Sequence, residues 1–190
     1  MSDSNFVSLK NYFLLAMPGL EDPNFKHSLI YLCEHTAEDG AMGLTINQPS
    51  SVPMSKVFEE FGLEFSPEAG DRNLLYGGPV QQERGFVLHR PATEPWQTTV
   101  EVAPDVCITA SRDIIEDMAR NKGPSSGFIT LGYAGWGPGQ LEQEITDNSW
   151  LLIEADPEII FDTPFEQRAE ATAAKLGISL DRLSSEAGHS

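Results

Sequence analysis

A glycine-rich segment is the part of the chain whose residue types best suit ligand binding. It runs from Leu131 to Gln140, has glycines at positions 132, 135, 137 and 139, and joins an expected strand to a helix expected near Pro138. Such a junction presents backbone N–H groups and the positive end of a helix to an anion. It lacks the Lys-Ser or Lys-Thr pair of a P-loop and the glycine spacing of a dinucleotide fingerprint. The alternative interpretation is a sharp turn that lets Trp136 pack on a sheet as part of the core.

A second tight loop, Gly77-Gly78-Pro79, follows another expected strand. Two glycines before a proline either expose backbone amides to a ligand or simply turn the chain. If this loop, Asn47 and the Gly135-Trp136-Gly137 loop converge, they form one pocket of backbone amides, an amide side chain and an aromatic wall. The predicted ligand-binding residues are Asn47, Gly77, Gly78, Arg84, Gly135, Trp136 and Gly137.

Few residues are candidates for catalysis. Arg84 and His89 flank an expected strand at 85–88, and histidine has an unperturbed pKa near neutrality, as an acid–base catalyst requires. No neighbouring residue is recognisable as a partner for His89, which favours a solvent-facing or structural histidine. No G-x-S-x-G, H-E-x-x-H, EF-hand or kinase motif is present. We predict no catalytic residues, and an enzyme with a cleft around His89, Arg84 or Arg112 remains the alternative.

The two cysteines do not predict a metal centre. Cys33 and His35 alternate with Leu29 and Tyr31 onto one face of an expected strand, but a zinc site needs three or four ligands and no second Cys/His cluster exists. Cys107 has the apolar neighbours of an inert core thiol. We therefore expect no metal and no cofactor, and two lone cysteines fit a reducing cytosol.

The overall charge argues against several partners. The chain has 12 basic and 29 acidic residues, a net charge of −17, and neither half is basic. Because nucleic-acid binding depends on concentrated Lys and Arg, direct contact with nucleic acid or with an anionic membrane is disfavoured. No apolar run reaches the length of a membrane span, and the start lacks the pattern of a signal peptide. We expect a soluble, cytoplasmic protein.

The elements that must position these residues are predicted from apolar patterning. Helices are expected around Val57, Phe58 and Phe61, ending at Gly62, and after an N-cap at Ser111, with Ile114, Ile115 and Met118 facing inward. Apolar runs bounded by turn residues predict strands at 13–17, 29–33, 42–46, 85–88, 106–109, 128–131 and 150–153.

The clearest helix signal is a capping box. Thr163 is the expected N-cap, Pro164 the first helical residue and Glu166 the capping partner, with Phe165, Ala169, Thr172, Ala173 and Leu176 on one side and Gly177 as the stop. A short helix is expected after Ser179. Strands clustered near the start favour an α+β fold, a single domain over residues 1–190, with a mixed sheet and packed helices.

The chain resembles the AlgH/YqgE family of bacterial proteins. The resemblance rests on blocks in register from about residue 10 onward: Ala16-Met17-Pro18, Asp22-Pro23-Asn24-Phe25, Ala41-Met42-Gly43-Leu44 with Ile46-Asn47-Gln48-Pro49, Gly77-Gly78-Pro79-Val80, Arg84-Gly85-Phe86-Val87-Leu88-His89, and Leu131-Gly132-Tyr133-Ala134-Gly135-Trp136 followed by Gln140-Leu141-Glu142 and Asn148-Ser149-Trp150. It implies a large mixed, partly curled sheet flanked by helices, in a bacterial cytoplasmic protein. It implies no reaction.

Members of this family have been labelled regulators of exopolysaccharide production. The chain has no helix-turn-helix with a basic recognition helix, so a transcriptional role would be indirect. The leading hypothesis is a non-enzymatic binding or regulatory protein that recognises a protein or small ligand through its glycine-rich loops.

Overall fold

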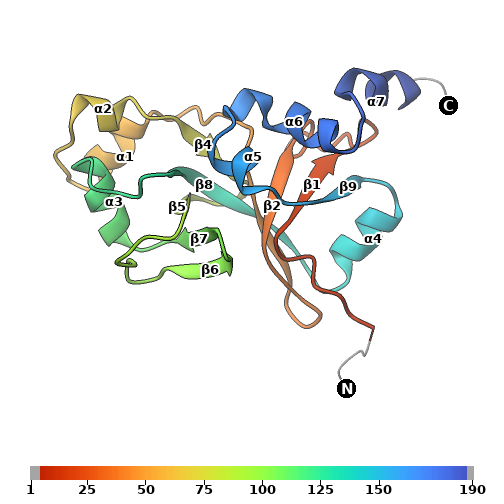
Figure 1. Ribbon diagram of the computed structural model, residues 1–190, viewed down its shortest axis with the longest axis horizontal. Helices are drawn as coiled ribbons and strands as arrows, with labels where there is room; N and C mark the ends of the chain where they lie inside the picture. The colour runs from red at the N-terminus through yellow and green to blue at the C-terminus, as the bar shows by residue number, and fades with distance from the viewer. Residues whose placement is uncertain (1–4, 188–190) are drawn as a thin grey trace.

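The backbone of the fold is one curled sheet of nine strands (Figure 1). The computed structural model describes residues 5–187. The strand order is β6-β7-β5-β8-β3-β2-β1-β9, with β4 beside β8 and off this path. The strands are β1 (Tyr12–Ala16), β2 (Leu29–Thr36), β3 (Gly40–Thr45), β4 (Leu74–Tyr76), β5 (Val80–His89), β6 (Val100–Ala103), β7 (Val106–Thr109), β8 (Gly127–Trp136) and β9 (Trp150–Glu154).

Strand pairing confirms the predicted mixed sheet. β4 runs parallel to β8, whereas the other neighbouring strands are antiparallel. β8 pairs with β4 and β5 along its first part and with β3 at its end, so it connects the two halves of the molecule (Figure 1). Between these parts, Gly132 has φ +78°, and a Cβ there would lie 2.3 Å from the carbonyl oxygen of Gly78. Only glycine fits this close approach of two backbones.

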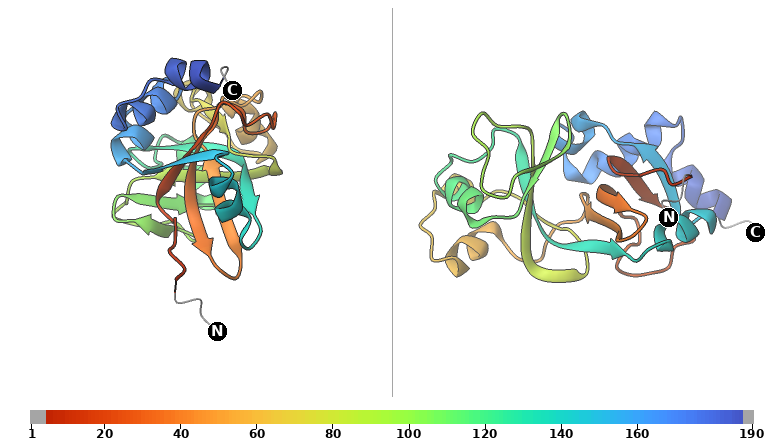
Figure 2. Two further views of the ribbon diagram at one scale, coloured as in Figure 1. Left: turned by 90° about the vertical axis from the view of Figure 1, so that its right-hand side faces the viewer. Right: turned by 90° about the horizontal axis from the view of Figure 1, so that it is seen from below.

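Helices surround the sheet at both ends and along its upper edge (Figures 1 and 2). The first three lie together at one end, α4 lies at the other end, and α5 to α7 lie above the sheet in the view of Figure 1. Among residues 5–187 no helix combines the length and apolar content needed to cross a membrane. The helices are α1 (Met54–Glu60), α2 (Pro67–Gly70), α3 (Arg112–Ala119), α4 (Gln140–Thr146), α5 (Pro157–Phe161), α6 (Arg168–Lys175) and α7 (Leu180–Ala187), with a 3₁₀ turn at Phe165–Gln167.

The largest core cluster lies inside the curl. It joins Val102 and Val106 from one end of the sheet to Ile153 at the other end, and α5 and α6 add Ile160 and Ala173. Side chains from both edges of a sheet can meet on one face only if the sheet curls toward that face. The sheet is therefore a half-barrel. A second cluster fills the space beneath α1 to α3, and a third lies under α4 on the opposite face.

The predicted strands are confirmed, including β4 before the Gly77-Gly78 turn, although several are longer than expected and β6 was not predicted. In α3, Ile114, Ile115 and Met118 are buried, as expected. Ser111 precedes this helix, but its hydroxyl donates to the Asp113 carboxylate at 2.5 Å, accepts the Thr98 N–H and makes no capping bond to a helix N–H.

Two helix predictions were wrong in detail. The capping box does not form, because a 3₁₀ turn at Phe165–Gln167 delays the start of α6 to Arg168; the Thr163 hydroxyl donates to the Glu158 carbonyl. Phe61 and Leu176 are 37% and 48% exposed, so they do not share the buried faces of α1 and α6. Each lies in the last turn, beside a glycine with positive φ that ends the helix as predicted.

Candidate functional site

The half-barrel leaves an open cavity, here called the mouth, between the β6–β7 hairpin and the far end of the β2–β3 hairpin. The two hairpins that line it are on the lower side of the sheet in Figure 1, away from α5 and α6. Its volume is about 630 Å³. The lining residues are Lys10, Cys33, Glu34, Asp39, Ala41, Met42, Arg84, Phe86, Thr98, Val100, Val102, Ile108, Ala110, Tyr133, Gly135 and Trp136.

The floor of the mouth is apolar. Phe86 and Tyr133 meet edge to face, with ring centroids 5.8 Å apart, and both pack on the core inside the curl. Val100, from the edge strand β6, is 52% exposed. The mouth therefore presents apolar side chains to solvent directly above the core.

A β-bulge decides which side chains face the mouth. The β2–β3 register shifts between Leu32 and Glu34, which makes Cys33 the extra residue. Because side chains alternate along a strand, one extra residue reverses every face beyond it. Cys33 and Glu34 consequently both line the mouth, and His35 turns to the opposite side, toward α4. The expected common face of Cys33 and His35 was therefore wrong.

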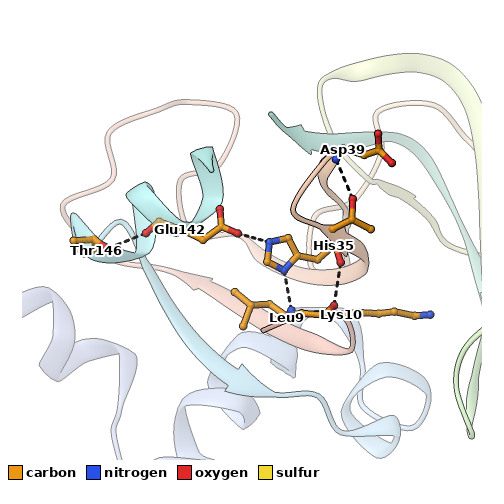
Figure 3. Close-up of polar contacts among 8 residues, drawn as sticks. Leu9, Lys10, His35, Asp39, Glu142 and Thr146 are labelled. Atoms are coloured by element: carbon orange, nitrogen blue, oxygen red, sulfur yellow. Dashed lines mark hydrogen bonds and ion pairs between the residues drawn. The ribbon is translucent and has the colours of Figure 1, made fainter. Parts of the chain in front are cut away.

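His35 fixes the parts of the rim in place (Figure 3). Its Nδ1 accepts the backbone N–H of Leu9 at 2.8 Å, and its Nε2 lies 2.5 Å from a carboxylate oxygen of Glu142 in α4. An Nδ1 that accepts carries no proton, so the ring proton is on Nε2 and is donated to Glu142. The Ser8 hydroxyl also donates to the His35 carbonyl. These bonds attach both α4 and the segment that carries Lys10 to β2.

The rim of the mouth carries charges of both signs. Lys10 and Arg84 are the cations, and Glu34 and Asp39 are the anions. All four are exposed, and within the described residues none takes part in an ion pair. The Arg84 guanidinium lies 5.0 Å from the centroid of the Phe86 ring, at the boundary between rim and floor. The rim groups are thus available to polar parts of a ligand.

The Cys33 thiol, which lines the mouth, is unreactive as a nucleophile. Burial, together with the charge of Glu34, raises the pKa of the Cys33 thiol far above neutrality. The thiol stays protonated at neutral pH and is a poor nucleophile. Burial also raises the pKa of Cys107, whose side chain is buried as expected for a core thiol. In the part of the chain that the structure describes, no group of three or more His, Cys, Asp or Glu side chains is arranged to hold a metal.

His89 lies apart from Arg84 and Arg112, the other candidates for catalysis. His89 is fully buried, with its Nε2 2.7 Å from the Thr109 hydroxyl and its Nδ1 2.8 Å from the Arg90 carbonyl oxygen. Burial lowers the pKa of His89, although the bond to the Arg90 carbonyl acts in the opposite direction. The lowered pKa keeps the ring neutral. Arg84 and Arg112 both line a neighbouring cavity of about 990 Å³ below α1 and α3, which His89 does not line. His89 is therefore a structural histidine.

The structure brings together three of the seven predicted ligand-binding residues. Arg84, Gly135 and Trp136 line the mouth, whereas Asn47, Gly77, Gly78 and Gly137 lie outside it. Asn47 ties β2 to the end of β3: its Oδ1 accepts from the Leu29 N–H, and its Nδ2 donates to the His27 carbonyl.

The Gly77-Gly78 turn packs tightly on β8. The Gly77 N–H donates to the Leu131 carbonyl, and a Cβ at Gly78 would lie 2.1 Å from the carbonyl carbon of Tyr133. Both glycines are buried. None of the described cavities is lined jointly by Asn47, Gly78 and Trp136.

The expected loop around Trp136 is instead the end of a strand. β8 continues through Gly135 to Trp136, and α4 begins at Gln140 rather than near Pro138, after Gly139 at φ +77°. Trp136 is 4% exposed, and its indole packs with Phe25 and Trp150 in the third core cluster. Its Nε1 donates to a carboxylate oxygen of Glu144 at 3.2 Å.

Comparison with known proteins identifies the family. The family model described as AlgH-like matches residues 13–181. The chain belongs to the AlgH-like family. A UPF0301 protein of Saccharophagus degradans is 53% identical over 97% of this chain and 90% of its own length. Another, from Thioalkalivibrio sulfidiphilus, is 52% identical over 99% of this chain and 98% of its own length.

Solved structures show the same AlgH-like fold. The solution structure of the AlgH protein from Pseudomonas aeruginosa has 43% identity and a TM-score of 0.79, with both chains covered completely. A crystal structure of protein DIP2367 from Corynebacterium diphtheriae has a TM-score of 0.63 at 24% identity, over 81% of this chain and 79% of that one. The second likeness concerns the fold alone.

Most residues of the mouth were missed by sequence reasoning. Lys10, Asp39 and Ile108 come from segments far apart in the chain and carry no motif. Glu34 reaches the mouth because of the bulge, which leaves no mark in the alternation of apolar residues. Arg84 was found because it stands at the polar end of an apolar strand.

Proposed function

We propose that this AlgH-like chain is a non-enzymatic binding protein of the bacterial cytoplasm that holds a small amphipathic ligand in the mouth of its half-barrel. The observation that carries this proposal is a cavity of about 630 Å³ with an apolar floor and a rim of exposed charges that form no ion pair among the described residues. Small-molecule sites typically have about 300–1,000 Å³, an apolar lining and a few polar groups that orient the ligand.

The lining defines the chemistry of the ligand. An apolar body would pack on Phe86, Val102 and Tyr133, where removal of water supplies most of the affinity. A polar or zwitterionic end would meet Arg84 and Lys10, or Glu34 and Asp39, at the rim. Exposed charge pairs add little affinity, so the rim would mainly select orientation and partner.

A regulatory role would require the ligand-bound chain to act on a protein partner. A net charge of −17 opposes contact with the DNA backbone, so any effect on transcription would be indirect. The protonated Cys33 thiol and the buried, neutral His89 supply no nucleophile and no accessible base, which favours binding over catalysis.

The test is a thermal-shift screen of amphipathic metabolites against the wild type and a blocked variant. Val100→Glu places a charge on the exposed edge of the floor, where the side chain is already 52% exposed and folding is little affected. A ligand at a hundred times its Kd stabilises by about 2.7 kcal/mol. This raises the melting temperature of a chain of this size by about 5–11 °C.

Val7→Glu is the matched control, because Val7 is 73% exposed and lies outside the mouth. A compound that stabilises the wild type and Val7→Glu, but not Val100→Glu, supports the proposal. If no compound stabilises the wild type, or if Val100→Glu responds as the wild type does, binding in the mouth is refuted.

A further inference from the structure

A buried arginine without a counter-ion lies on the other side of the molecule from the mouth. Arg168, at the start of α6, is 6% exposed. Its Nη1 donates to the Ile46 carbonyl at 2.6 Å and its Nε to the Thr163 carbonyl at 3.0 Å. Its guanidinium also lies 4.4 Å from the centroid of the Phe128 ring. Among the described residues, Nη2 has no hydrogen-bond acceptor and Arg168 makes no ion pair.

This arrangement is costly in a folded protein. A buried charge is ordinarily paired with an opposite charge, because carbonyl dipoles replace only part of its hydration. Burial, partly offset by the charge of exposed Glu166, lowers the pKa of Arg168 to about 10, so the group is still cationic at neutral pH. Arg72 and Arg84 also lack an ion pair among the described residues, but both are exposed, whereas Arg168 is buried.

Arg168 borders a cleft of about 390 Å³, here called the Arg168 cleft. The cleft lies between the α1–α2 end of the molecule and the α5–α6 segment, above β4 and β8 (Figure 1). A second cation, Arg72, and the amide of Asn73 stand on the opposite wall. The one carboxylate of the lining, Asp162, is held by Arg90 at 2.7 Å. The unpaired charge in this cleft is therefore positive.

The remaining walls are mostly apolar and include three phenylalanines beside aliphatic side chains such as Leu75 and Ile129. Phe128 and Phe161 have ring centroids 6.4 Å apart, and Phe165, in the 3₁₀ turn before α6, also lines the cleft. A neighbouring depression of about 370 Å³ shares Arg72, Asn73 and Phe165 with the cleft, and exposed Asp71 borders only this outer part. Aromatic rings next to a guanidinium suit a flat ring that carries a negative group.

We propose that the Arg168 cleft binds a small aromatic oxyanion, with the guanidinium of Arg168 receiving the carboxylate or phosphate and the phenylalanine walls packing on the ring. The bound anion would pair with a guanidinium that makes no ion pair among the described residues. This site is separate from the mouth and does not depend on ligand binding there.

The test is a titration of ¹⁵N-labelled protein with phenyl phosphate and with benzoate, which separate the two oxyanion chemistries. Inorganic phosphate tests the anion alone, and benzamide tests the ring alone. The readout is the side-chain Nε–Hε resonance of Arg168, together with the backbone resonances of Asn73 and Phe165. At least one of the two aromatic anions, phenyl phosphate or benzoate, should shift these signals in a saturable manner. The anion that does so should bind more tightly than inorganic phosphate and more tightly than benzamide.

Variants separate the site from general charge effects. Arg168→Gln should weaken binding at least about tenfold, the value of one hydrogen bond to a charged group. Because Arg168 also holds two backbone carbonyls, this variant risks unfolding, and Arg72→Gln at the exposed wall is the second variant. Arg72→Gln should weaken binding by about threefold, as expected for an exposed charge. Arg120→Gln, which removes an exposed arginine outside the cleft, is the matched control.

Three results would overturn the proposal. The first is the absence of any saturable shift at Arg168 with either aromatic anion at millimolar concentration. The second is equal weakening by Arg72→Gln and Arg120→Gln, which indicates general electrostatic attraction. The third is equal affinity for inorganic phosphate and for the aromatic anions, which removes any role for the phenylalanine walls.

Discussion

Replacement of Trp136 by alanine separates a core role from a recognition role. The indole is 4% exposed and lies among Phe25, Trp150 and Leu141. A tryptophan buries about 150–250 Å², which at about 25 cal/mol per Å² corresponds to about 4–6 kcal/mol. Measured costs for large aromatic residues are about 3–5 kcal/mol, because the cavity partly relaxes. We expect Trp136→Ala to lower the free energy of unfolding by about 3–5 kcal/mol.

The expected loss corresponds to a fall in melting temperature of about 6–20 °C for a chain of this length. Urea denaturation followed by far-UV circular dichroism measures it directly. Trp136→Phe is the graded control, since it keeps a ring in the cluster and loses the 3.2 Å hydrogen bond to Glu144. It should cost about 1–2 kcal/mol, because most of the apolar contact remains.

A nearly unchanged melting temperature would refute this reasoning. If Trp136→Ala melts within about 2 °C of the wild type, less than about 1 kcal/mol has been lost, and the ring does not support the core. Loss of ligand binding in such a stable variant would then identify Trp136 as a recognition residue.

Three further predictions concern stability and partners. Thr45 has a buried hydroxyl with no hydrogen-bond partner among the described residues. Thr45→Val should therefore raise the free energy of unfolding, measured by urea denaturation, by about 1 kcal/mol. A lower free energy of unfolding in this variant would show that the hydroxyl has a hydrogen-bond partner. Burial lowers the pKa of His89, so the unfolded state binds the extra proton and stability should fall as the pH drops below about 6.5. The urea midpoint of His89→Asn should depend less on pH between about 5.5 and 7.5, and an unchanged dependence would assign the effect to other groups. In gel-shift assays at low ionic strength the protein should leave duplex DNA unshifted, whereas a salt-sensitive shift would reveal phosphate contacts.

Local patterns in the sequence predict the elements well, because apolar runs and turn residues act within a few positions. The apolar run at 106–109 became β7 without change, and Gly177 ends α6 as expected. The capping box at Thr163 failed because the chain forms a 3₁₀ turn at Phe165–Gln167 and α6 begins only at Arg168.

The candidate site is harder to predict, because it depends on how strands curl together. The bulge at Cys33 places Glu34 in the mouth and His35 under α4, and alternation alone predicts the reverse for His35. Arg168 was passed over because nothing in a capping pattern indicates that an arginine will be buried without a counter-ion. The sequence placed Gly78 in a tight loop and among the predicted ligand-binding residues. The structure shows that its backbone packs closely against that of Tyr133.

The pairing of β1 with β9 has a consequence for how the chain folds during synthesis. Phe13 and Leu14 pair with Ile153 and Leu152, so a strand made at the start must wait for residues made almost at the end. Until then the edge of β1 that pairs with β9 leaves its backbone N–H and C=O groups unpaired, the condition in which strands associate with other chains. Contacts between such distant residues also slow folding, typically to milliseconds or seconds. Ribosome-bound chains that stop before Trp150 should therefore depend on chaperones far more than the finished protein does.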